Sequence, residues 1–110
     1  LVLLNDPQFV EAARALAERL LESPDSDDSS RLASGFELVT GRPAATDELK
    51  VIEEVLERER ARYGSNSSAA ELLLAIGEFP RNGSISAAEH AAWTQVASLL
   101  LNLSETVTNH

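Results

Sequence analysis

The segment SPDSDDSS holds the residues of this sequence that come nearest to a metal-binding motif. A calcium loop needs oxygen ligands at alternating positions, and the carboxylates of Asp25, Asp27 and Asp28 begin such a pattern. Counting Asp25 as the first position puts Ser30 where the loop requires glycine and Phe36 where it requires a bidentate glutamate. These two departures favour a solvated loop. A calcium-binding or sugar-binding module built on this loop is the weaker alternative.

The two histidines have no partners at the spacing that metal or acid–base chemistry requires. His90 follows Glu89, but no second histidine stands four residues away, so the zinc-protease pattern is absent. We assign Glu89 to a capping box with Ser86, an arrangement that marks the start of a helix. His110 is the last residue of the sequence. We therefore expect no catalytic or metal-binding role for either histidine.

The remaining carboxylates are better explained by helix structure than by catalysis. Asn5 and Asp6 stand directly before Pro7, and an aspartate before a proline is typical of a helix N-cap, so we prefer a cap to a polar site. Glutamates over 53–59 alternate with arginines, as on a solvated helix face. The sequence has neither a glycine-rich phosphate loop nor a GxSxG nucleophile motif. It therefore predicts no catalytic, cofactor-binding or metal-binding residue in this chain.

Composition limits the class of protein further. The chain has 110 residues, of which 44% are hydrophobic and 25% charged, as in one ordinary globular domain. Eighteen acidic and nine basic residues give a net charge of -9, which argues against binding to nucleic acid or to anionic membranes. No apolar stretch approaches the roughly 18 residues that a membrane-spanning helix needs. We expect no membrane insertion.

Two residue types are missing altogether. Without cysteine, this chain can form no disulfide, thiolate nucleophile, cysteine zinc site or covalent haem attachment. Without methionine, it is most simply interpreted as a piece of a longer polypeptide. Its first four residues are apolar, and we predict that they form an interface with a preceding region or insert into this domain as a hook. These residues are Leu1, Val2, Leu3 and Leu4.

The positions of caps, breakers and apolar residues predict an all-α fold, a compact bundle of about five helices. Ser29 or Ser30, Thr46, and Ser67 or Ser68 are the expected caps of the second, third and fourth helices. The helices are expected over 7–22, from 29 or 30 to 41, 46–64, 67–77, and from 86 to about 103.

The last of these helices is expected to be central. Its apolar residues cover more than one face, which is typical of a helix packed on several sides. Trp93 lies within this run. A tryptophan can anchor a partner protein, but its apolar neighbours Ala92 and Val96 favour a place in the core.

Three ordered segments carry a resemblance to a known family. They are LLNDPQFVEAARALAERLL, LVTGRPAATDEL and AAWTQVASLLLNLSETV. In this order and spacing they resemble the C-terminal end of a planctomycete-specific domain of unknown function. Ser104 and Val107 depart from that family's usual residues, without changing the expected fold.

The resemblance implies a kind of parent protein and its location in the cell, but no particular reaction. Family members are large, exported bacterial proteins that often also carry a cytochrome-c-like domain, so haem would lie outside this chain. The resemblance implies that 1–110 is one helical domain, the C-terminal fragment of a multidomain protein in the periplasm or at the cell surface. We expect a non-catalytic interaction module whose partners are other domains of the parent. The alternative is one wall of an active site, for redox or polysaccharide chemistry, completed by the missing N-terminal region.

Overall fold

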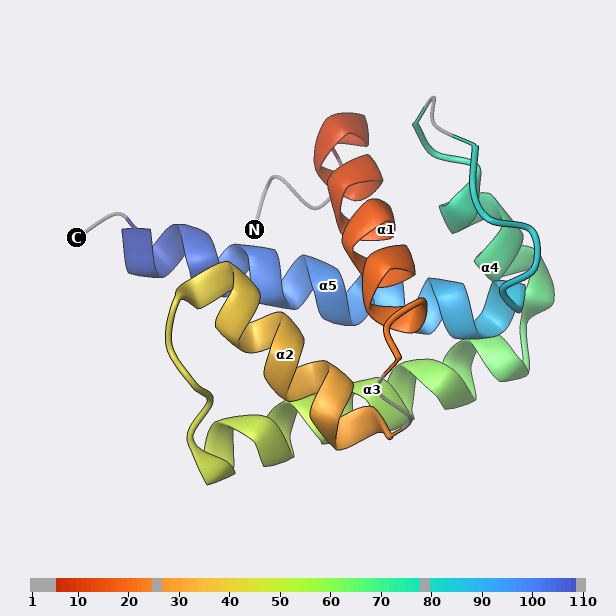
Figure 1. Ribbon diagram of the computed structural model, residues 1–110. Coiled ribbons are helices and arrows are strands. Elements are labelled where there is room, and N and C mark those ends of the chain that lie inside the picture. The colour runs from red at the N-terminus through yellow and green to blue at the C-terminus, as the bar shows by residue number, and fades with distance from the viewer. Residues whose placement is uncertain (1–5, 25–26, 78–79, 109–110) are drawn as a thin grey trace.

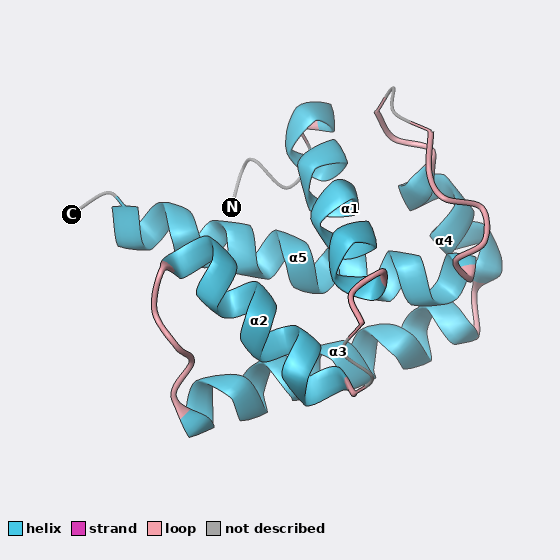
Figure 2. Cartoon of the chain, viewed as in Figure 1, coloured by secondary structure: helices cyan, strands magenta, loops and turns pink. Residues whose placement is uncertain are grey.

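Helices make up the regular structure of the chain. The computed structural model describes residues 6–24, 27–77 and 80–108, with side chains described as far as Ser104, and no strand occurs within these ranges (Figures 1 and 2). The helices are α1 (Pro7–Leu21), α2 (Asp28–Thr40), α3 (Thr46–Gly64), α4 (Ser67–Leu74) and α5 (Ala87–Thr108). The prediction of an all-α bundle of about five helices is confirmed.

Local chemistry explains where α1 begins. The carboxylate of Asp6 accepts a hydrogen bond from the main-chain N–H of Gln8 over 2.8 Å, and Pro7 occupies the first helical position. Asp6 is therefore an N-cap, as predicted. Along the helix, one face is buried at three- and four-residue intervals, by Val10, Ala13, Arg14, Ala17 and Leu20.

Three predicted helix caps are wrong. At α4 the cap is Asn66, whose side chain accepts from the N–H of Ala69 over 3.1 Å, and not Ser67 or Ser68. The side chain that caps α2 belongs to Asp27, which accepts from the N–H of Ser30 over 2.7 Å, so neither Ser29 nor Ser30 is the cap. At α3 the cap position is Ala45, and Thr46 is already helical. The side chain of alanine has no hydrogen-bond acceptor, so it cannot cap the helix. The main-chain N–H of Ala45 donates to the carboxylate of Glu48 over 2.9 Å. A carboxylate in the first turn provides this second route to a stable helix start.

The last helix is the centre of the bundle, as predicted. α5 packs against each of the other four helices, and it continues to Thr108, beyond the expected end near Leu103. Figure 1 shows α5 running across the molecule, with α1 crossing over it and α3 below. The radius of gyration of 13.2 Å agrees with the value of about 13 Å expected for a compact domain of this length.

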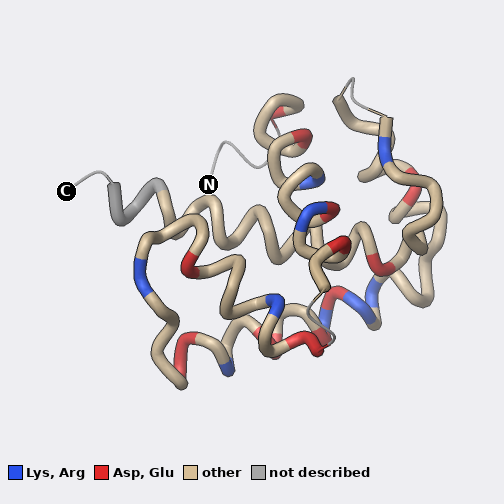
Figure 3. Tube along the Cα trace, viewed as in Figure 1, with Lys and Arg blue, Asp and Glu red and all other residues tan. Residues whose placement is uncertain are grey.

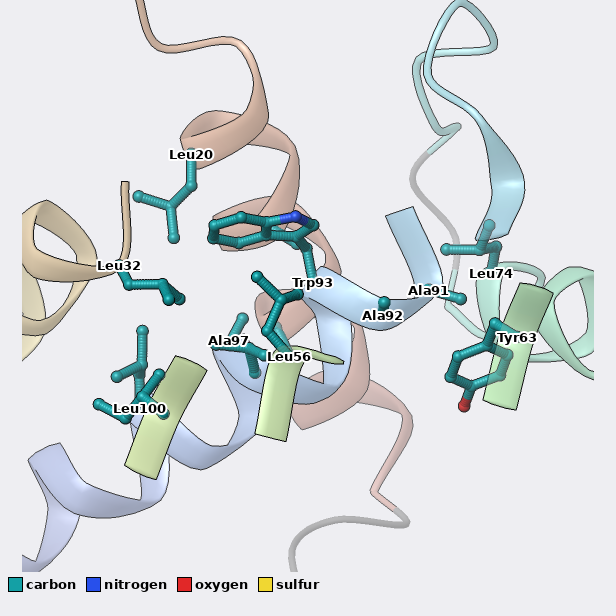
Figure 4. Packing of buried hydrophobic residues seen from close by; sticks show 14 of the residues in the cluster. Leu20, Leu32, Leu56, Tyr63, Leu74, Ala91, Ala92, Trp93, Ala97 and Leu100 are labelled. Carbon is teal, nitrogen blue, oxygen red and sulfur yellow. The ribbon is translucent and has the colours of Figure 1, made fainter. Parts of the chain in front are cut away.

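A continuous apolar core surrounds α5. Trp93 is 0% exposed and lies toward the middle of the cluster in Figure 4, close to Leu56. Leu32 lies on one side of it, and Tyr63 and Leu74 lie on the other. Truncating a buried aromatic side chain of this size costs about 3–5 kcal/mol. The core interpretation of Trp93 is therefore confirmed, and a contact with a partner would require the indole to leave the core.

A glycine allows α2 to approach its neighbours closely. A Cβ atom built on Gly35 would lie 2.8 Å from Cδ1 of Leu20, on α1, and 3.2 Å from Cδ1 of Leu100, on α5. Real Cβ atoms are essentially never as close as the first of these distances. Gly35 thus permits the crossing of α1, α2 and α5.

Candidate functional site

Five polar residues gather between α1 and the start of α5. Glu11, Arg14 and Glu18 follow one another on α1 at spacings of three and four residues, which places them on one face of the helix. Arg81, in the connection between α4 and α5, and His90, in the first turns of α5, complete the group. We call these five residues the α1 polar cluster.

His90 is the most deeply buried member of the α1 polar cluster, at 0% exposed. Nη1 of Arg81 lies 3.3 Å from Nδ1 of His90, and a guanidinium can only donate, so Nδ1 is the acceptor. Nε2 therefore carries the proton and donates to the main-chain carbonyl of Arg14 over 3.2 Å. Burial lowers the pKa of His90 below 6.5, although its carbonyl partner and the carboxylate of Glu18 act in the opposite direction. The imidazole is a neutral group that joins two helices.

The rest of the cluster fastens α1 to the segments around α4. Nη1 of Arg14 donates to the main-chain carbonyl of Leu74 over 2.5 Å, and Nη2 lies 3.9 Å from the carboxylate of Glu11. The carboxylate of Glu18 accepts from the main-chain N–H of Asn82 over 3.0 Å. These bonds satisfy main-chain groups that have no partner in a regular helix, so the cluster holds the fold together.

A cavity of about 220 Å³ opens beside the cluster. It is lined by Glu11, Arg14, Ala15, Glu18 and Pro80. His90 is not in the lining, and both of its ring nitrogens are engaged with protein atoms. Within the described ranges, no group of three His, Cys, Asp or Glu residues is placed to hold a metal ion. The cavity thus offers two carboxylates and a guanidinium, and its lining includes no Ser, Thr, Cys, Lys or His.

A second polar group joins α2, α3 and α5. The guanidinium of Arg60 donates to both oxygens of Asp28, over 2.6 and 3.0 Å, and to both oxygens of Glu89, over 3.0 and 2.8 Å. Hydrogen bonding to Arg60 lowers the pKa of Asp28 and raises that of Arg60. We call these three residues the Arg60 clamp. Two bidentate pairs on one guanidinium fix both distance and angle between helices.

The Arg60 clamp corrects the prediction for Glu89. The carboxylate of Glu89 bonds Arg60 and also accepts from Nε1 of Trp93 over 3.3 Å. Of the predicted capping box, the described contacts include only the half in which Ser86 accepts from the N–H of Glu89, at a long 3.5 Å. The prediction that Glu89 is used by the box is therefore wrong, because a charged partner on another helix binds this carboxylate more strongly than a main-chain N–H does.

An apolar hollow of about 230 Å³ opens on another side of the bundle. Phe36 of α2, Glu48, Val51 and Ile52 of α3, and Leu99 and Leu103 of α5 line it. We call it the α3–α5 hollow. Val51 stays 56% exposed at its edge, although it is a large aliphatic residue. Val51 could hardly be recognised from the sequence, where its one signal is its place beside the apolar residues at 52, 55 and 56.

An ion pair borders the α3–α5 hollow. Both terminal nitrogens of Arg42 donate to the carboxylate of Glu48 over 2.9 Å, and the guanidinium carbon lies 4.9 Å from the centre of the Phe36 ring. Hydrogen bonds from Arg42 and from the N–H of Ala45 lower the pKa of Glu48 to about 2. Glu48, the one charged residue in the lining, is thus already neutralised by a protein cation. What the hollow offers a ligand is apolar surface.

The other candidate residues for metal binding, catalysis or an interface form structural contacts or lie outside the described ranges. Asp27 caps α2 and Asp28 belongs to the Arg60 clamp, so neither carboxylate is held in the manner of a calcium loop. Asp25, His110 and the predicted interface Leu1–Leu4 lie outside the described residues. No described helix is both long and apolar enough to cross a membrane.

Comparison with known proteins places the chain in a family. A model of a family of proteins of unknown function, described as PSD1 or DUF1553, matches residues 1–56, just over half of the chain. The chain belongs to this family. The PSD1 match covers α1, α2 and the first half of α3, and so includes the LLNDP and GRPAATDEL segments. No curated protein and no solved structure gives a significant match.

Proposed function

We propose that this chain is a non-catalytic helical module that docks onto other domains of a large exported bacterial protein. By the family resemblance, that parent protein lies in the periplasm or at the cell surface of a planctomycete, and this chain is its C-terminal part. Haem, where a parent of this kind has a cytochrome-c-like domain, is bound outside this chain. The observation that carries the docking role is the α3–α5 hollow, an open apolar recess on the surface of a folded bundle.

The contrast between the two cavities supports docking over catalysis. The polar cavity is built from side chains that bond main-chain groups of neighbouring segments, so their hydrogen-bonding capacity serves the fold. The α3–α5 hollow has one polar residue, Glu48, and it is paired with Arg42. Apolar recesses of this kind on soluble domains are commonly binding surfaces for protein partners.

Titration calorimetry tests the proposal. The remaining domains of the parent protein are expressed separately and titrated with the 110-residue chain. We expect binding that Val51→Asp weakens by about tenfold or more, since a charge would enter an apolar contact. Leu72→Asp is the matched control, because Leu72 is a 72% exposed leucine on α4 and does not line the hollow. Absence of heat with every domain would overturn the proposal.

The apolar run Leu1–Leu4 remains a proposed part of the interface. Deleting these four residues should weaken binding to the parent domains or lower the stability of the chain. If neither quantity changes, these residues have no role in docking. The deletion is compared with Val51→Asp in the same titration, so that the contribution of the run is separated from that of the hollow.

An active-site wall is the second candidate, and the polar cavity is the observation that favours it. Glu11 and Glu18 both line this cavity, and paired carboxylates can act as acid and base. Under this alternative, Glu11→Gln and Glu18→Gln would remove an activity of the full-length protein while circular dichroism of the chain stayed unchanged. Retained activity in both variants excludes it. A calcium or sugar site on the SPDSDDSS loop is disfavoured, because Asp27 and Asp28 are engaged by the fold.

A further inference from the structure

The size of the α3–α5 hollow decides between a small molecule and a protein side chain. Its volume of about 230 Å³ falls below the roughly 300–1,000 Å³ of pockets that enclose drug-sized ligands. A space of this size takes one or two aliphatic side chains from a partner. An apolar side chain inserted into such a recess is the usual centre of a protein interface.

The secondary structure around the hollow determines the form of that partner. The lining comes from three helices, α2, α3 and α5, and no strand occurs in the described ranges to which an extended peptide could add. Helical domains bind peptides by laying an amphipathic helix into an apolar groove, with anchors at intervals of three and four residues. The hollow therefore suits a helix.

The charges next to the hollow indicate which charge a partner should carry. On α3, Val51 has Asp47 one turn before it and Glu54 one turn after it, and both are exposed. Within the part of the chain that the structure describes, neither carboxylate forms an ion pair. Lys50 is also exposed and lies one turn from both carboxylates, so the three side chains together carry one net negative charge. Lys50 lies about 100° around the helix from Val51, farther than either carboxylate. Figure 3 shows the acidic segment at the start of α3.

Charge also argues against a second copy of this chain as the occupant. Each copy has a net charge of -9, so two acidic rims would face each other across a symmetric interface. A partner with lysine or arginine beside its apolar anchors would instead be attracted. The favourable occupant is thus basic as well as apolar.

We propose that the α3–α5 hollow binds an amphipathic helix with lysine or arginine beside its apolar anchors, supplied by another domain of the parent protein. Val51, Leu99 and Leu103 contact the anchors, and Asp47 and Glu54 contact the basic flank. This inference rests on the proposed function, because it specifies which part of the parent docks. It adds the chemistry of the partner.

Fluorescence anisotropy with peptides tests this inference. Overlapping peptides of about 18 residues, or five helical turns, cover the rest of the parent protein. We expect the peptides that bind to have a net positive charge and apolar residues at helical spacing. Val51→Asp should weaken their binding by about tenfold. The double variant Asp47→Asn, Glu54→Gln should weaken it by a few fold at about 50 mM salt, and by less at about 300 mM. Leu72→Asp should leave it unchanged.

Several outcomes would overturn the inference, and they differ from those that overturn docking itself. Selection of neutral or acidic peptides, or no effect of the double variant, excludes the basic partner. Sedimentation showing a dimer that Val51→Asp dissociates identifies a second copy as the occupant. If no peptide binds but intact parent domains bind in a Val51-dependent manner, the helix proposal fails and the docking function stands.

Discussion

His90 and Arg14 join α5 to α1 through one hydrogen bond, in which the imidazole Nε2 donates to the main-chain carbonyl of Arg14 over 3.2 Å. The contact that needs a neutral ring is the one at Nδ1, which accepts from Arg81 and leaves the single proton on Nε2. Protonating Nδ1 would set it against the guanidinium of Arg81, in a place where His90 is 0% exposed. The stability of this junction thus depends on the charge of one buried base, through its burial and its contact with Arg81.

This dependence predicts a loss of stability in mild acid. Burial lowers the pKa of His90 below 6.5, so below that pH the unfolded chain binds a proton that the folded chain does not. The free energy of unfolding should be constant for His90 above about pH 6.5 and fall as the pH is lowered through its folded pKa. The slope between the two pKa values is up to about 1.4 kcal/mol per pH unit. Urea unfolding at about pH 7.5, 6.5 and 5.5 measures it.

His90→Gln is the variant that isolates this effect. A glutamine nitrogen can still donate to the carbonyl of Arg14, but the side chain does not titrate. We expect the difference in unfolding free energy between the two proteins to shrink as the pH falls from about 7.5 to about 5.5. His110 is present in both proteins and its contribution cancels. Parallel pH profiles for the two proteins would show that His90 does not control the stability of this junction.

We predict that the close packing allowed by Gly35 stabilises the fold by more than the low helix propensity of glycine destabilises it. Replacing glycine by alanine inside a helix gains about 0.5–1 kcal/mol. At Gly64, the last residue of α3, a new Cβ meets no atom within 4 Å, so Gly64→Ala should show a gain of up to this size. At Gly35 the new Cβ would be 2.8 Å from Leu20 and 3.2 Å from Leu100. Overpacking costs about 1–3 kcal/mol, so Gly35→Ala should be neutral to destabilising.

Denaturant unfolding of both variants gives the comparison directly. Gly64→Ala serves as the control for helix propensity, and the difference between the two variants reports the cost of separating α2 from α1 and α5. We expect Gly35→Ala to be less stable than Gly64→Ala by about 1–3 kcal/mol. Because the nearest atoms are the ends of leucine side chains, part of the cost can be relieved by rotamer changes. Equal stability of the two variants would mean that the helices do not need this glycine to pack.

The parts of the fold that depend on neighbours in the sequence could be predicted. Asp6 and Pro7 identify the start of α1, and Gly41, at φ 80°, ends α2, because capping depends on residues within one turn. The central place of α5 could also be predicted, because the spread of its apolar residues over more than one face can be recognised within the segment itself. The start of α2 could not be fixed in the same way, because SPDSDDSS contains several residues able to cap a helix, of which Asp27 is the one that does so.

The candidate sites depend on contacts between distant residues, and the sequence could not predict them. His90 bonds a carbonyl 76 positions away, and Arg60 bonds carboxylates 29 and 32 positions away. Spacing rules apply within a helix, so they assigned Glu89 to the nearby Ser86 and missed its long-range partner. The α3–α5 hollow was missed for the same reason, since its lining comes from three separate helices.

The Arg60 clamp gives the last prediction, on how much one guanidinium contributes to the arrangement of α2, α3 and α5. Its side chain is 26% exposed, and those of Asp28 and Glu89 are 37% and 38% exposed, so water screens part of the attraction. We expect Arg60→Met to lower the free energy of unfolding by about 1–2 kcal/mol, well below the 3–5 kcal/mol typical of breaking a buried pair. Arg60→Lys should recover only part of this loss, because an ammonium cannot form two bidentate pairs.

Arg62→Met is the matched control for the Arg60 clamp. Arg62 lies on the same helix, is 57% exposed, pairs only with Glu59 among the described carboxylates and has its guanidinium carbon 4.9 Å from the centre of the Tyr63 ring, so its loss should cost no more than about 1 kcal/mol. Chemical denaturation in urea at low and at high salt compares the variants, and salt should reduce the effect of Arg60→Met. Equal losses for the two arginines would mean that the clamp adds nothing beyond an ordinary surface pair. A loss well above 3 kcal/mol would mean that the clamp acts as a buried charge, because removing Arg60 would leave Asp28 and Glu89 as neighbouring carboxylates without a cation.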